Sequence, residues 1–147
     1  MSAREREART LTSLVKLARA AADAAGQEVS EMEAAIADTD DRLRLLADAV
    51  VWEEGLARAS DTVDFDSLSR FREGMARKQK SLAETRDKQA AALVAARANL
   101  QAAFAEMKKL EHLLESANTA AADRRLRADA MRLDEAARAR HRRGALR

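Results

Sequence analysis

An apolar residue recurs every three or four positions between Leu11 and Val50, and this spacing constrains the fold more than any other feature of the sequence. The positions are Leu11, Val15, Ala18, Ala22, Ala25, Val29, Met32, Ile36, Thr39, Leu43, Leu46 and Val50, and only Thr39 among them is polar. A mean step of about 3.5 residues over so many turns is typical of a left-handed coiled coil. This helix therefore needs a second helix to cover its apolar side, and the rest of the same chain is the natural candidate.

The second periodic segment begins at Leu68. It continues through Phe71, Met75, Lys78, Leu82, Thr85 and Gln89, and then through Leu93, Ala96, Leu100, Ala103, Met107, Leu110, Leu114 and Ala117. Two successive steps of four residues around Gln89 predict a stutter, which locally relaxes the supercoil. Lys78, Thr85 and Gln89 make the seam polar just before the stutter, which weakens the packing but helps to fix the register.

Residues 55–67 contain the only cluster of Ser, Thr, Asp and Gly in the chain. Because such side chains form local hydrogen bonds that compete with helix, we expect a turn centred near residues 59–65. Asp64 or Asp66 is expected to cap the following helix. The predicted fold is all-α, a long antiparallel two-helix coiled-coil hairpin with the C-terminal helix overhanging. It is a single hairpin over residues 1–147, with helix one at about 5–57, the turn at about 58–66 and helix two at about 67–142.

The two helices have unequal lengths. If position i of the first helix faces roughly position 123 minus i of the second, Leu11 lies near His112 and residues beyond about Ala120 have no partner in the chain. This overhang is rich in Ala and Arg, and an isolated helix of that kind is marginally stable. We therefore infer that it binds a partner.

Composition excludes several classes of protein. The chain lacks Cys and Pro, contains 35% charged and 3% aromatic residues, and has a net charge of +2. Such a composition is typical of long helices, and the charge creates no strongly basic field. No apolar run approaches the roughly 20 residues of a membrane-spanning helix, and no secretory signal is evident, so we expect an intracellular protein.

The sequence carries no recognisable catalytic or metal-binding motif. His112 and His141 are far apart, and the four glycines form no phosphate-binding loop. The Arg run around His141 lacks interleaved aromatic residues, so it is better explained as cations at the end of a helix than as a nucleic-acid site. We expect no enzyme activity, no metal, no cofactor, no nucleic acid and no small-molecule substrate.

Trp52 lies near the turn and outside the seam, and it is the only Trp in the chain. Phe65, Phe71 and Met75 are close to the same end of the hairpin. Because Trp is enriched among binding hot spots, a contact with a partner is one interpretation of Trp52. A structural plug that closes the end of the coil is the other.

Two stretches resemble the FliJ family of the bacterial flagellar type III export apparatus. They are Met107-Lys108-Lys109-Leu110-Glu111-His112-Leu113-Leu114 and Leu133-Asp134-Glu135-Ala136-Ala137-Arg138-Ala139-Arg140. The first is similar to the family's Lys-x-Leu-Glu-x-Leu pattern and the second to its Leu-Asp-Glu-x-Ala-x-x-Arg pattern. Length and the position of the turn are also similar to those of the family.

The resemblance implies an antiparallel coiled coil similar to the central stalk of rotary ATP synthases, at the cytoplasmic face of the inner membrane. Its paired terminal ends would contact the hexameric flagellar export ATPase through residues that we call the ring set: Leu11, Leu14, Lys108, Leu110, Leu114, Leu133 and Arg138. The hairpin end would contact the export gate membrane protein through the gate set: Leu46, Ala49, Trp52, Phe71 and Met75. Family members often have tyrosines in the gate region, whereas this chain contains none. Export chaperones are a further implied class of partner.

Two alternatives remain open from the sequence. An export chaperone or escort protein should expose a large apolar groove, whereas this chain shows narrow seams. A structural coiled-coil subunit of another assembly should form oligomers that depend on concentration, whereas a stalk should be a monomer or a weak dimer.

Overall fold

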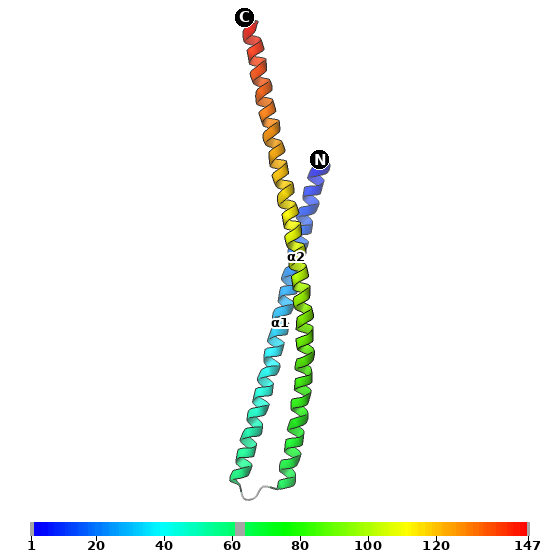
Figure 1. Ribbon diagram of the computed structural model, residues 1–147, viewed down its shortest axis with the longest axis vertical. Coiled ribbons are helices and arrows are strands. Elements are labelled where there is room, and N and C mark those ends of the chain that lie inside the picture. The colour runs from blue at the N-terminus through cyan, green and yellow to red at the C-terminus, as the bar shows by residue number, and fades with distance from the viewer. Residues whose placement is uncertain (1, 61–63, 147) are drawn as a thin grey trace. The chain divides into compact units, whose positions relative to one another are not determined.

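The computed structural model describes residues 2–60 and 64–146. These residues form two helices, α1 (Ala3–Ala59) and α2 (Phe65–Ala145), and no strand (Figure 1). The predicted all-α hairpin fold is confirmed. Each helix extends two or three residues further at both ends than the sequence suggested, and residues 61–63 of the expected turn lie outside the described residues.

The chain divides into two units, and each pairs a segment of α1 with a segment of α2. Unit 1 comprises Met1–Ala21 and Ala103–Arg147, and unit 2 comprises Ala22–Ala102. Ion pairs link Arg19 to Glu111 in unit 1 and Glu33 to Arg97 in unit 2. A second pair in unit 2 joins Glu54, later in α1, to Arg72, earlier in α2, so the paired segments run antiparallel there.

Side-chain caps define where both helices begin. At α1, the Ser2 hydroxyl accepts a hydrogen bond from the Glu5 backbone N–H at 3.2 Å, and the Glu5 carboxylate accepts one from the Ser2 backbone N–H at 3.0 Å. This reciprocal arrangement is a capping box. At α2, the Asp64 carboxylate accepts hydrogen bonds from the Asp66 N–H at 3.1 Å and the Ser67 hydroxyl at 3.2 Å. Of the two expected caps, Asp64 is therefore the one that acts.

The buried core is narrow, as two paired helices require. In unit 2, Val29, Leu93 and Ala96 are buried, and Met32, Ile36 and Leu100 pack against them. In unit 1, Val15 and Ala18 are buried. The seam predicted along α1 accounts for all of the α1 residues in these clusters.

The seam predicted along α2 is wrong at Lys78 and Thr85, which are exposed. The half-buried residues are instead Gln79 and Arg86, one position further along the helix. Two successive steps of four residues therefore occur around Met75, two heptads earlier than the predicted stutter at Gln89. The physical reason is that Arg86 has an ionic partner on α1, Asp40, which makes a charged residue acceptable beside the seam.

The alignment of the two helices also differs from the expected one. The residue numbers of the pairs Glu54–Arg72, Asp40–Arg86, Glu33–Arg97 and Arg19–Glu111 add up to between 126 and 130 rather than 123. In unit 1 a groove is lined by residues 2–8 of α1 and residues 117–128 of α2. Residues 2–8 of α1 thus lie across this groove from α2 as far as Ala128, but the last half-buried residue of the pairing is Ala121, in agreement with the expected limit near Ala120. We call residues 129–146 the unpaired segment.

Candidate partner-binding surfaces

All seven residues of the ring set lie in unit 1, but they occupy different environments. Leu11, Leu110 and Leu114 are half-buried members of the seam. Their side chains stabilise the pairing of α1 with α2, which leaves little of their surface for a partner. Leu14, at 40% exposure, lies at the margin of the seam.

Lys108 is exposed and belongs to a small charged cluster that joins the two helices of unit 1. Its Nζ lies 5.3 Å from the centroid of the Phe104 ring and 3.6 Å from Glu111 Oε2. Arg19 of α1 donates from Nε to the other oxygen of Glu111 at 3.0 Å. The hydrogen bond from Arg19 is the main cause that lowers the pKa of Glu111; partial desolvation opposes it, and Lys108 adds to it. Glu111 therefore stays ionised and bridges the two cations.

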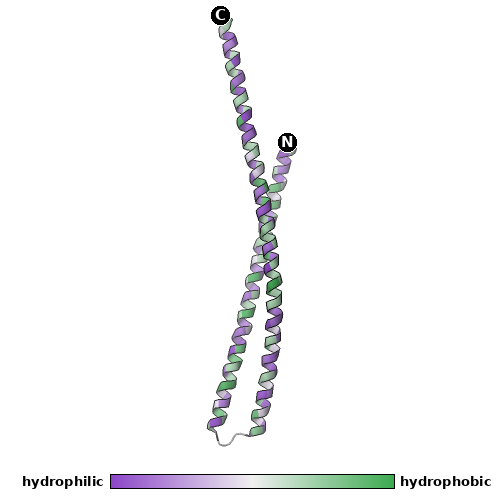
Figure 2. Cartoon of the chain, viewed as in Figure 1, coloured by the Kyte–Doolittle hydropathy of each residue, from purple (hydrophilic) through white to green (hydrophobic). Residues whose placement is uncertain are grey.

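Leu133 and Arg138 lie in the unpaired segment and are exposed, Leu133 at 72%. Met131 is similarly exposed, and Ala137, Arg138, His141 and Arg142 line a shallow hollow. Hydrophobic and hydrophilic residues alternate along this part of α2 (Figure 2). Residues 122–147 contain nine Arg and only four Asp or Glu. This part of the chain therefore presents apolar side chains within a basic surround, which suits an acidic protein surface with apolar pockets.

All five residues of the gate set lie in unit 2, but the structure does not give them one common surface. Leu46, Ala49, Phe71 and Met75 are half-buried between the helices. Trp52 is 69% exposed. A plug would be buried, so the interpretation of Trp52 as a structural plug is wrong.

Trp52 belongs to an apolar stripe on α1 that sequence reasoning did not identify as a unit. We call Leu45, Ala49, Trp52 and Leu56 the outer stripe; three of them are exposed and Ala49 is half-buried. Trp52 and Leu56 line a shallow apolar hollow together with Asp48, Val51 and Gly55. The spacing of four, three and four residues was a visible signal of this stripe. It was missed because the stronger seam occupies the neighbouring positions.

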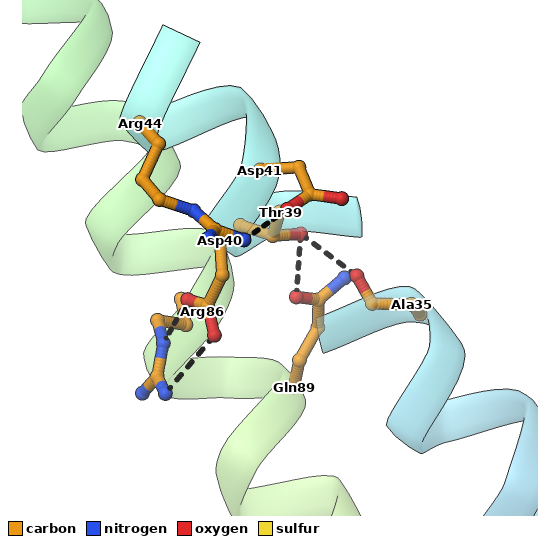
Figure 3. A network of polar contacts seen from close by, with 7 residues as sticks. All are labelled: Ala35, Thr39, Asp40, Asp41, Arg44, Arg86 and Gln89. Carbon is orange, nitrogen blue, oxygen red and sulfur yellow. Dashed lines mark hydrogen bonds and ion pairs between the residues drawn. The ribbon is translucent and has the colours of Figure 1, made fainter. Parts of the chain in front are cut away.

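A polar layer interrupts the seam of unit 2 (Figure 3). Thr39 Oγ1 lies 2.8 Å from Gln89 Oε1 on the other helix and 3.1 Å from the carbonyl oxygen of Ala35 in its own helix. Beside it, Arg86 donates from Nε to Asp40 at 2.5 Å. This hydrogen bond is the main cause that raises the pKa of Arg86. The layer is therefore satisfied in hydrogen bonds although Thr39 is buried.

Within residues 2–60 and 64–146, no three His, Cys, Asp or Glu side chains are grouped so that they could hold a metal ion. Neither α1 nor α2, as far as they are described, contains a stretch that is apolar and long enough to cross a bilayer.

Comparison with known proteins gives one informative result. A family model described as Flagellar FliJ protein matches residues 7–146, which includes most of both units. No curated protein matches the chain, and no solved structure matches it. The match confirms the resemblance inferred from the two short stretches in α2.

Proposed function

Since the chain belongs to the FliJ family and is thereby a component of the flagellar export apparatus, we propose that it couples the hexameric export ATPase to the export gate as an adaptor similar to a central stalk. In this proposal unit 1 binds the ATPase ring and unit 2 binds the gate membrane protein, at the cytoplasmic face of the inner membrane. The chain itself catalyses no reaction. Export chaperones are a further class of partner.

The observation that carries the proposal is the unpaired segment. A helix that exposes Met131 and Leu133 among many arginines leaves apolar surface uncovered and basic charge unneutralised. An isolated helix of this kind gains little stability from within, so binding to a partner is the way in which its apolar side becomes buried. The stretch that is most similar to the family pattern, Leu133 to Arg140, lies in this same segment.

The exposed outer stripe supports a second contact in unit 2. Trp52 combines a large apolar surface with a polar N–H and is the residue type most enriched at binding hot spots. Asp48 and Glu53 beside it form no ion pair among the described residues. A gate surface with an apolar pocket and a basic rim would complement this stripe.

The test is the ATPase activity of the cognate export ATPase with and without the purified chain. The intact chain should raise the activity, and deletion of residues 129–147 should abolish the increase while the circular dichroism of the remainder stays helical. The paired substitutions Leu133→Ala and Arg138→Ala should also reduce it. Leu17→Ala with Lys16→Ala is the matched control, since it removes an exposed Leu and a cation from α1, outside the unpaired segment. Full stimulation by the deletion variant would contradict the proposal.

A further inference from the structure

The polar layer in unit 2 occupies a position where an apolar residue would pack better. Thr39 is 4% exposed and is the only polar residue that is buried among those the structure describes. Its hydroxyl group can donate its one hydrogen to the Ala35 carbonyl oxygen or to Gln89 Oε1, which both lie within hydrogen-bond distance of the same Oγ1. Polar pairs inside a coiled coil weaken packing but select one alignment of the helices over others. The question is which alternatives this pair excludes.

Between Gln79 and Leu100 of α2, and between Val29 and Val50 of α1, the positions that face the other helix repeat every seven residues, so a slide of seven residues again places most apolar positions there against apolar ones. The stutter around Met75 breaks this repeat only at the end of the pairing that is nearest the turn. The surface ion pairs distinguish these alignments poorly. A slide in one direction brings Asp40 opposite Arg97, and a slide in the other brings Glu33 opposite Arg86. Exposed pairs of this kind also contribute little to stability. Within the part of the seam that repeats every seven residues, neither the apolar positions nor the ion pairs therefore select the observed alignment strongly.

The Thr39–Gln89 pair does distinguish the alignments. The two residue numbers add up to 128 in the observed alignment. A slide of seven residues places Gln89 opposite Met32 or Leu46, which are both apolar members of the α1 seam. Thr39 would keep the Ala35 carbonyl in its own helix, but the amide of Gln89 would lose its partner on α1. Gln89 is half-buried, so its amide would lose this hydrogen bond at a site with limited access to water, and the loss is unfavourable in both directions of the slide.

We propose that the hydrogen-bonded layer of Thr39 and Gln89 fixes the register of α1 against α2 by excluding alignments shifted by one heptad. A slide of seven residues moves the middle of the turn by only three or four residues, and no Pro opposes that movement. This proposal concerns unit 2 alone and does not rest on the proposed function.

The experiment uses the absence of Cys from the full chain, because each introduced pair of cysteines is then the only pair present. Glu33→Cys with Arg97→Cys reports the observed register, since these side chains meet at 3.1 Å. Glu33→Cys with Ala90→Cys, or with Phe104→Cys, reports a slide of seven residues in either direction. The probe is a short thiol-reactive cross-linker at low protein concentration, with the product identified by mass spectrometry.

With Thr39 and Gln89 intact, only the 33–97 pair should cross-link efficiently. In the background Thr39→Val with Gln89→Leu, at least one of the two shifted pairs should rise several-fold while the chain stays helical. Thr85→Val with Gln101→Leu is the matched control, because both of those residues are exposed and their replacement should leave the 33–97 pair dominant. Cross-linking that stays confined to 33–97 in the apolar background would overturn the proposal.

A second variant keeps the proposal testable if the apolar background aggregates. Gln89→Leu alone removes the amide and leaves Thr39 bonded to Ala35, so it should also release the shifted cross-links. Unchanged cross-linking in this variant would count against the proposal in the same way. Because none of these measurements involves an ATPase or a gate, a failed register experiment is distinguishable from a failed adaptor function.

Discussion

Arg19 on α1 and Glu111 on α2 form an ion pair across unit 1, with Arg19 Nε 3.0 Å from Glu111 Oε1. Lys108 approaches the second carboxylate oxygen of Glu111 at 3.6 Å. The Glu111 carboxylate therefore links α2 to α1 through Arg19 and also contacts Lys108, a residue of the ring set. Its effect on stability and its effect on partner binding should be measured separately.

The first prediction concerns pH. The pKa of Glu111 is lowered in the folded chain, chiefly by the hydrogen bond from Arg19, so its ionised form stabilises the fold. This contribution is present above the pKa of an unfolded Glu, about 4.3, and is lost as the pH falls through the lower folded value. Glu111→Gln should therefore lower the melting temperature slightly at pH 7, and the difference from the unmodified chain should shrink towards pH 3. Thermal melts followed by circular dichroism measure it.

Glu115→Gln is the control for this experiment. Glu115 is exposed, lies one turn further along α2 and forms no ion pair among the described residues. Its replacement should leave the melting temperature nearly unchanged at both pH values. If Glu115→Gln had the same effect as Glu111→Gln, the ion pair with Arg19 would not be the cause.

The second prediction concerns the buried cluster of unit 2. Leu93 is buried against Val29 and Ala96, so Leu93→Ala removes apolar contacts and leaves a cavity. We expect a loss of about 2 kcal/mol in the free energy of unfolding, at the low end for buried Leu because a two-helix core is thin. Val94→Ala is the matched control, since Val94 is exposed on the same helix, and should change the free energy by less than about 0.5 kcal/mol. Urea titrations compare the two; equal losses would place Leu93 outside the core.

The third prediction is a gain in stability from Gly26→Ala. Gly26 lies inside α1, where Gly costs about 1 kcal/mol relative to Ala. A Cβ at this position would lie 3.9 Å from Leu100 Cδ1, which is an ordinary van der Waals contact. The free energy of unfolding should rise by up to about 1 kcal/mol. Gly55→Ala is the comparison variant, because a Cβ there would meet no atom within 4 Å and the change reports helix propensity alone. Any difference between the two variants then measures the contact with Leu100. A loss of stability in Gly26→Ala would mean that α1 and α2 approach more closely there.

Sequence patterns predicted the parts of this fold that depend on apolar spacing alone. The α1 seam is correct because every member but Thr39 is apolar, and burial of apolar surface dominates the pairing. The α2 seam was misassigned around Arg86 because a charged residue is acceptable there only through Asp40, which lies 46 positions away in the chain. Pair partners at such distances follow from the alignment of the helices, and a heptad repeat leaves that alignment ambiguous.

For the candidate binding surfaces, the sequence indicated which residues to consider but not whether their side chains are exposed. Trp52 was identified from its residue type, and its exposure rules out the plug, while its contact with a partner stays a prediction. Leu11, Leu110 and Leu114 were assigned to the ring set by family resemblance, which stays a prediction, and their half-buried positions show that they hold the helices together. A pattern of letters cannot separate these two roles, because a residue in a helix pair can be apolar for packing, for binding or for both.

The last prediction concerns the outer stripe. Trp52→Ala should leave the melting temperature within about a degree of the original, because a side chain that is 69% exposed contributes little to packing. If the proposed adaptor function holds, the same change should weaken binding to the export gate by about 2 kcal/mol or more, the size expected of a Trp hot spot. Calorimetric titration of the cytoplasmic part of the gate protein measures this, with Val94→Ala as an exposed apolar control in the same unit. Leu56→Ala should have a smaller effect in the same direction, since Leu56 lines the same hollow. Undiminished gate binding by both outer-stripe variants would remove this surface from the contact and leave Phe71 and Met75 as the residues to test.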